Sequence, residues 1–109
     1  MNNDHVVEAH VPIQHTVVFR LIHESNSAEE SEFLDTATRI LAAIEGVEAF
    51  AVDRQISSTS DLRWRFSMLF RNQSAYEAYN NNPAHVRFVN ERWLTEVAAF
   101  QELDFIART

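Results

Sequence analysis

The chain has little or none of several residue types, and each shortage narrows what it can do. Its 109 residues include no cysteine and no lysine, one glycine and two prolines. Without thiols it cannot form a disulfide, a zinc–thiolate centre, an iron–sulfur cluster or a cysteine nucleophile. So few glycines and prolines also make long flexible linkers unexpected.

Positive charge is scarce as well. The chain has nine arginines and sixteen acidic residues, which gives a formal net charge of −7. This balance argues against a general nucleic-acid binder, which needs positive charge opposite phosphates. No apolar run is long enough to cross a membrane, and the residues before Pro12 lack the basic and apolar regions of a signal peptide. We therefore expect a cytoplasmic protein with no nucleic-acid or membrane partner.

Hydrophobic residues make up 46% of the sequence, too many for a disordered chain. The length suits one small domain with its own core. Residues 1–13 mix polar residues with isolated valines and are interpreted as an N-terminal arm, either loose or added to a sheet edge or to a partner subunit. The domain itself is expected to span residues 14–109.

Residue patterns predict four strands and two helical regions. Runs rich in β-branched and aromatic residues predict strands at 15–23, 47–56, 62–70 and 100–106. Capping boxes at residues 27–30 and 74–77 predict the two helix starts. We expect Gly46 to end the first helix and Pro83 to interrupt the second helical region, with Val97 on the apolar stripe of its last helix. The order predicts an α+β, ferredoxin-like βαββαβ fold with both helices on one face of an antiparallel sheet.

Two helices can cover only one face of this sheet. The other face carries Val18, Ile22 and other apolar residues, and such a face is typical of an interface. We therefore expect a homodimer that closes an α/β barrel. Arg20 and Arg65 fall on that face. They either pair with acids of the last strand, for which Glu102 and Asp104 are the candidates, or lie in water at its rim.

The residues best suited to chemistry surround the Asn82-Pro83 break. His85 is expected near the start of the helix after Pro83, where the helix dipole lowers the imidazole pKa and keeps a general base neutral. Tyr79 precedes the break and offers a phenol, and His15 opens the first strand. The candidate catalytic residues are therefore His85, Tyr79 and His15, although each also has a purely structural explanation.

An aromatic space is expected beside these three residues, and apolar walls with a few polar groups describe a small-molecule site. Its predicted ligand-pocket residues are Phe19, Trp64, Phe66, Phe88 and Trp93, which equally suit a plain core. The five-residue spacing of His5, His10 and His15 matches neither a helix face nor a strand face, so no metal site is predicted there. The sequence has no phosphate loop and no GxSxG or HExxH motif, and we expect no cofactor.

Four segments resemble the stress-responsive dimeric A/B barrel (Dabb) domain family. They are His15-Thr-Val-Val-Phe-Arg, Gly46-Val-Glu-Ala-Phe, the segment from Tyr79 through Pro83-Ala-His85 to Val89, and Phe100 to Phe105. The resemblance covers about residues 14–106 and implies a ferredoxin-like fold and a homodimer. Many members have no assigned activity, so it implies a dimeric barrel of unassigned activity that binds a small hydrophobic or aromatic ligand.

One member type of the family, olivetolic acid cyclase, suggests the alternative of an enzyme. The resemblance implies His85 as general base, Tyr79 as the residue that orients it or the substrate, and His15 as a hydrogen-bond donor to a carbonyl. A pocket tyrosine of the cyclase corresponds here to Ala37, so the catalytic set differs. The enzyme alternative is therefore a small acid–base catalyst similar to a polyketide cyclase or to a cofactor-free isomerase or monooxygenase.

Overall fold

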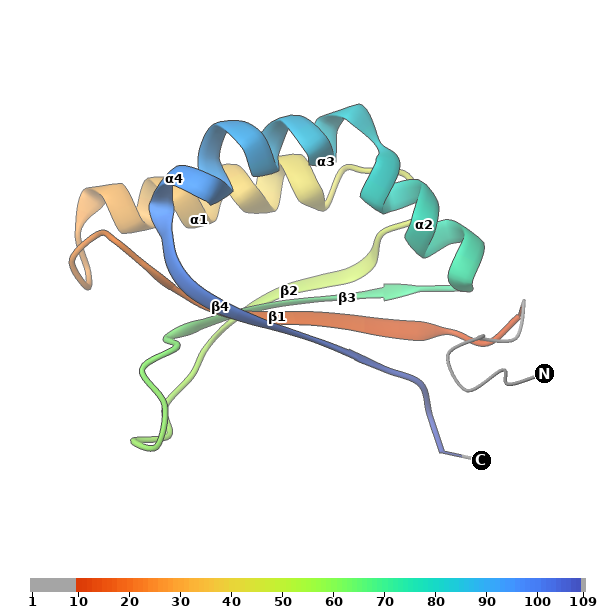
Figure 1. The fold of residues 1–109 in the computed structure, drawn as a ribbon, viewed down its shortest axis with the longest axis horizontal. Coiled ribbons are helices and arrows are strands. Elements are labelled where there is room, and N and C mark those ends of the chain that lie inside the picture. Colours follow the sequence, from red (N-terminus) through yellow and green to blue (C-terminus); the bar gives the residue numbers. More distant parts are fainter. Residues whose placement is uncertain (1–9, 109) are drawn as a thin grey trace.

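A four-stranded antiparallel sheet carries all the helices on one of its faces in the computed structural model, which describes residues 10–108 (Figure 1). Its elements are, in chain order, β1 (Ile13–Leu21), α1 (Ala28–Leu41), β2 (Glu48–Arg54), β3 (Trp64–Phe70), α2 (Gln73–Asn81), α3 (Pro83–Phe88), the π-helical turn η1 (Val89–Trp93), α4 (Leu94–Glu96) and β4 (Val97–Phe105). The strand order is β2-β3-β1-β4. This arrangement confirms the predicted α+β, ferredoxin-like fold.

The first helix begins as its capping box predicts but ends earlier than expected. The Ser27 hydroxyl accepts a hydrogen bond from the Glu30 backbone N–H at 3.1 Å, which satisfies one of the free donors of the first turn. The Glu30 carboxylate accepts from the backbone N–H of Asn26 at 2.9 Å. Helix α1 then ends at Leu41, and turns lead to Gly46, whose φ of +91° is readily available only to glycine.

The second helical region differs from the prediction in three details. Helix α2 is capped by Asn72, whose side chain accepts from the backbone N–H of Ala75, so Ser74 lies inside the helix. The helical residues after Pro83 include the π turn η1, where the Leu94 N–H donates to the Val89 carbonyl five residues back. Val97 begins β4 instead of lying on the helical stripe, because its backbone is already extended.

The core lies between the helices and the sheet and is largely aromatic. The ring of Phe19 lies 4.6 Å from that of Phe66 and 5.0 Å from that of Trp93, centroid to centroid. Phe33 of α1 also packs against Phe19 and is fully buried. These contacts attach the helices to one face of the sheet, where burial of large rings contributes most of the hydrophobic stabilisation.

The outer face of the sheet corrects one expectation about its arginines. Arg20 pairs with Asp61 at 3.3 Å and Arg65 with Asp53 at 2.8 Å. Glu102 and Asp104 lie on the other face, because the register sets them opposite Val17 and His15. Both arginine side chains are more than two-fifths exposed, so within one chain they are in contact with solvent, although they belong to the inner strands β1 and β3 and not to the rim of the sheet.

Most of the proposed N-terminal arm, residues 1–13, lies outside the residues that the structure describes. Residues 1–9 lie outside the described part, His5 included, and β1 already contains Ile13. Within residues 10–108, no helix is both long enough and apolar enough to cross a bilayer.

Candidate functional site

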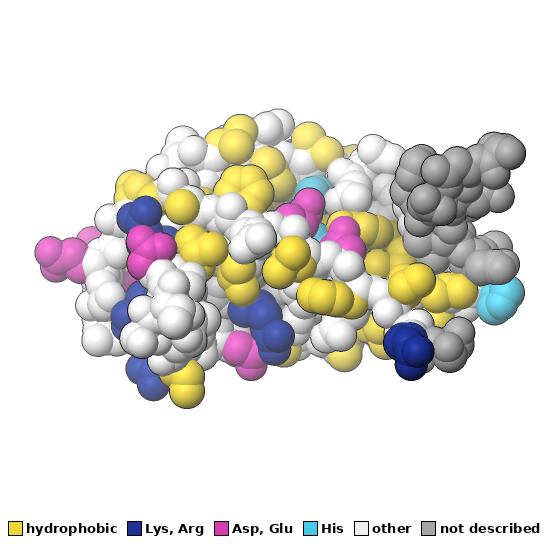
Figure 2. Space-filling model, turned by 60° about the horizontal axis from the view of Figure 1, so that its bottom comes forward, with side chains coloured by type: hydrophobic (Ala, Val, Ile, Leu, Met, Phe, Trp, Pro, Cys, Tyr) yellow, Lys and Arg dark blue, Asp and Glu magenta, His cyan; other side chains and the backbone are white. Residues whose placement is uncertain are grey.

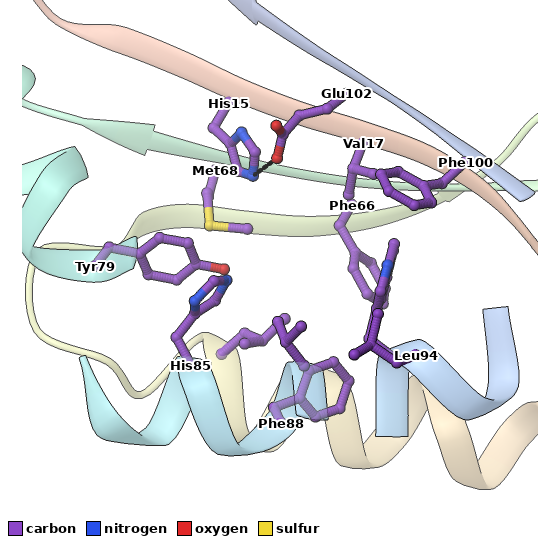
Figure 3. A pocket seen from close by; sticks show the side chains of 13 residues that line it. His15, Val17, Phe66, Met68, Tyr79, His85, Phe88, Leu94, Phe100 and Glu102 are labelled. Carbon is purple, nitrogen blue, oxygen red and sulfur yellow. Dashed lines mark ion pairs between the residues drawn. The ribbon is translucent and has the colours of Figure 1, made fainter. Parts of the chain in front are cut away.

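A cavity of about 270 Å³ lies between the sheet and the helices that follow Pro83 (Figure 3). Its polar wall consists of His15, Tyr79, His85 and Glu102. The rest of the wall is apolar and is formed by Val17, Leu41, Phe66, Met68, Phe88, Val89, Trp93, Leu94 and Phe100. Leu94 and Phe100 are 66% and 56% exposed, so they mark the open side of the cavity.

Local structure around the proline break positions His85. Asn82 adopts an extended conformation before Pro83, and its side chain accepts from the Ala84 backbone N–H at 2.8 Å, which caps α3. His85 follows in the first turn of this helix. Its ring packs against that of Tyr79 with centroids 4.4 Å apart (Figure 3).

The hydrogen bond made by His85 determines which ring nitrogen can act as a base. Its Nδ1 lies 3.2 Å from the backbone carbonyl oxygen of Asn80. A carbonyl only accepts, so Nδ1 carries the hydrogen, and Nε2 of the neutral ring keeps its lone pair. The geometry therefore leaves Nε2 as the acceptor and potential base of this imidazole.

Burial shifts the pKa of both residues of this pair in the direction that favours the uncharged form. It lowers the pKa of His85, while the hydrogen bond to Asn80 acts in the opposite direction and the nearby His15 lowers that pKa further. The direction agrees with the sequence-based expectation, and its largest cause is burial. Burial also raises the pKa of Tyr79, and the charge of Glu102 adds to the shift.

His15 lies in a second, more extensive polar cluster on the sheet side. Its Nδ1 is 2.6 Å from Oδ1 of Asp104, and its Nε2 is 3.7 Å from Oε2 of Glu102. The Tyr76 hydroxyl donates to the other Asp104 oxygen at 2.8 Å and lies 3.0 Å from His15 Nδ1. Burial raises the pKa of Tyr76, and its hydrogen bond to Asp104 adds to the shift. His15 is thus held in place and is only 4% exposed.

The structure places the predicted site residues in two groups. All three candidate catalytic residues line the cavity, as do Phe66, Phe88 and Trp93. Phe19 is fully buried in the core beside the cavity, and Trp64 turns its indole N–H to the Glu30 carboxylate at 3.0 Å. Within the described residues, no group of three or more histidines and acids is arranged to hold a metal ion.

The acidic part of the site differs from the sequence-based expectation. Glu102 and Asp104 lie beneath the helices and not on the outer face, and Tyr76, which is not among the candidate site residues, joins them. Alternation along the last strand was the available signal, because residues 100, 102 and 104 share one face. Only the pairing of His15 with Asp104 in the sheet identifies that face as the one beneath the helices.

Comparisons with known proteins agree with this fold. The family model described as Stress Responsive A/B Barrel Domain (Dabb) matches residues 13–107. A Dabb family protein with a ferredoxin-like fold from Mesorhizobium loti is 48% identical, with a TM-score of 0.90 over 91% of this chain and 99% of that chain. A comparison with curated proteins found no significant match.

More distant structures share the fold alone. A protein from Thermobifida fusca, described as dimeric, ferredoxin-like and of unknown function, is 15% identical, with a TM-score of 0.70 over 89% of this chain and 92% of that chain. A hydroxynitrile lyase from Passiflora edulis is 10% identical, with a TM-score of 0.73 over 91% of this chain and 95% of that chain.

The protonation of His85 can be measured directly. We expect NMR titration of its ring to give a pKa below the ordinary value of about 6.5. The unfolded chain then binds this proton more tightly than the folded one, so protonation of His85 lowers the free energy of unfolding as pH falls below about 6.5. Comparison with His85→Gln at each pH isolates this contribution. A titration at or above the ordinary value would contradict the assignment of a buried, neutral imidazole.

Proposed function

Because the chain belongs to the stress responsive A/B barrel domain family, we propose that it acts as a homodimer in which each subunit binds a small, mostly apolar molecule between sheet and helices. The observation that carries this proposal is the cavity of about 270 Å³, with its apolar walls and its single polar side. A few placed polar groups in an otherwise apolar pocket are typical of small-molecule sites.

The size of the cavity limits the ligand. An apolar cavity of about 150 Å³ is large enough to hold benzene. The larger volume here therefore suits one aromatic ring with a short alkyl chain. The ring would contact Met68 and Phe88, and the polar head would reach His85 and Tyr79.

Binding can be tested with 4-propylphenol as the probe. We expect NMR shift changes at the Met68 methyl group and the Trp93 indole, with a dissociation constant measurable by calorimetry. His85→Ala should weaken binding by about tenfold, the effect of one lost hydrogen bond to the head group.

His23→Ala is the control, because His23 pairs with Glu96 and does not line this cavity. Equal affinity of the His85→Ala variant and the wild type would contradict a site at His85.

Dimer formation is supported by the uncovered face of the sheet. Ile22, Leu103 and Phe105 are 62%, 42% and 52% exposed in the single chain. Figure 2 shows hydrophobic side chains along this face between scattered charged groups. Exposed apolar area of this kind is typical of an interface, and the similar protein from Thermobifida fusca is described as dimeric.

We expect sedimentation at micromolar concentration to give a dimer, and Leu103→Arg to give a folded monomer. Leu103 lies opposite Thr16 on the uncovered face, so an arginine there would be buried without a partner. Ile56→Arg is the matched control, because Ile56 is a loop residue that is already 85% exposed. A wild-type protein that sediments as a monomer would rule out this assembly.

Acid–base catalysis is the second candidate function, favoured by the free Nε2 of His85. A neutral imidazole held by one nitrogen, with the other facing an apolar cavity, meets the requirements of a general base. The Tyr79 ring beside it can orient the base or the substrate. Substrates of the right size are small aromatic or polyketide-like carbonyl compounds.

Proton abstraction is tested by hydrogen–deuterium exchange in heavy water at the acetyl methyl group of 4-propylacetophenone, the methyl group next to the carbonyl. We expect the wild type to accelerate exchange, and His85→Gln to reduce the acceleration by at least about a hundredfold, as for loss of a general base. His23→Gln should retain the wild-type rate. Binding of the ketone without any accelerated exchange would reject catalysis of this step while leaving the binding function in place.

A further inference from the structure

Among the described residues, the cavity wall holds one carboxylate, that of Glu102, and no lysine or arginine to balance its charge. Glu102 is the only Asp, Glu, Lys or Arg among the residues that line the cavity within the described chain. Its side chain is 55% exposed, so its carboxylate is accessible from the cavity. Figure 3 shows this carboxylate beside His15, on the same side of the cavity as Tyr79 and His85.

His15 does not supply the missing positive charge to a ligand. Its two ring nitrogens already face Asp104 and Glu102, at 2.6 Å and 3.7 Å. If the ring is protonated, its charge is shared between two carboxylates, and the cluster remains negative. If the ring is neutral, the cluster is more negative still.

Tyr76 makes this arrangement rigid. By donating to the second oxygen of Asp104, it fixes that carboxylate against His15 and away from other partners. Within the described residues, Glu102 has no such second donor and remains the carboxylate that a ligand can reach. The polar groups offered to a head group are therefore the Glu102 carboxylate and Nε2 of His85, which accept, and the Tyr79 hydroxyl, which can donate or accept.

We propose that Glu102 makes this cavity selective for uncharged ligands whose head group donates a hydrogen bond, such as a phenol or an alcohol, and excludes carboxylates of the same shape. This inference rests on the proposed function, because it concerns the same cavity. An anionic head would enter a largely apolar space next to a like charge, with no lysine or arginine among the described residues of the wall. A hydroxyl head donates to an acceptor that is already in place.

The test compares 4-propylphenol with 4-propylbenzoate, whose head group is charged at neutral pH and larger by two non-hydrogen atoms; the Glu102→Gln comparison below separates charge from size. We expect the wild type to bind the phenol more tightly by about tenfold, the effect of one like charge nearby at low ionic strength. Glu102→Gln keeps the shape of the side chain and removes the charge. It should strengthen benzoate binding and narrow the ratio of affinities by about the same factor.

Two controls separate the charge of Glu102 from other effects. Glu45→Gln removes one negative charge from an exposed position away from the cavity and should leave the ratio unchanged. Added salt should strengthen benzoate binding to the wild type more than to Glu102→Gln, because salt screens the same repulsion.

The possible outcomes distinguish the two proposals. Equal binding of both probes by the wild type, or a ratio that Glu102→Gln does not change, would overturn the role of Glu102 and leave ligand binding standing. Failure of both probes to bind any variant would overturn the proposed function and this inference together.

Discussion

The break between α2 and α3 is the constraint on which the cavity depends. Proline lacks an N–H and excludes helical geometry from the residue before it, and Asn82 accordingly adopts an extended conformation. In an unbroken helix, residues 79 and 85 would project roughly 120° apart around the axis. The break instead sets the end of one helix against the start of the next and brings the rings of Tyr79 and His85 into contact.

The same break explains the chemistry available at His85. The last carbonyls of a helix have no partner within that helix, and the backbone oxygen of Asn80 belongs to this group. His85 satisfies it through Nδ1, so the hydrogen bond that completes the end of α2 also determines the tautomer of the imidazole. The need of the Asn80 carbonyl for a hydrogen-bond donor thereby leaves Nε2 of His85 available to a ligand in the cavity.

The part of the polar wall that the sheet supplies depends on strand register. Pairing of β1 with β4 sets Asp104 opposite His15 and Glu102 opposite Val17, on the face beneath the helices. A carboxylate so near an apolar cavity without a partner would destabilise the fold. The register prevents this for Asp104, because it brings His15 and Tyr76 into contact with it. The π turn η1 contributes Val89 and Trp93 to the apolar wall of the cavity, and Leu94 follows it directly.

The sequence by itself determined the elements and several of their ends. The residues responsible act locally: Ser27 caps the helix that follows it, Pro83 breaks the next helical region, and alternation along residues 64–70 turns one side of β3 to the core. The candidate trio of His15, Tyr79 and His85 also came from local signals at element ends. Only the tertiary structure decided that Trp64 bonds to Glu30 and that Glu102 and Asp104 join His15. The physical reason is that element type follows from neighbours along the chain, whereas strand register and side-chain partners depend on residues far apart in sequence, whose contacts form only when the sheet and helices pack together.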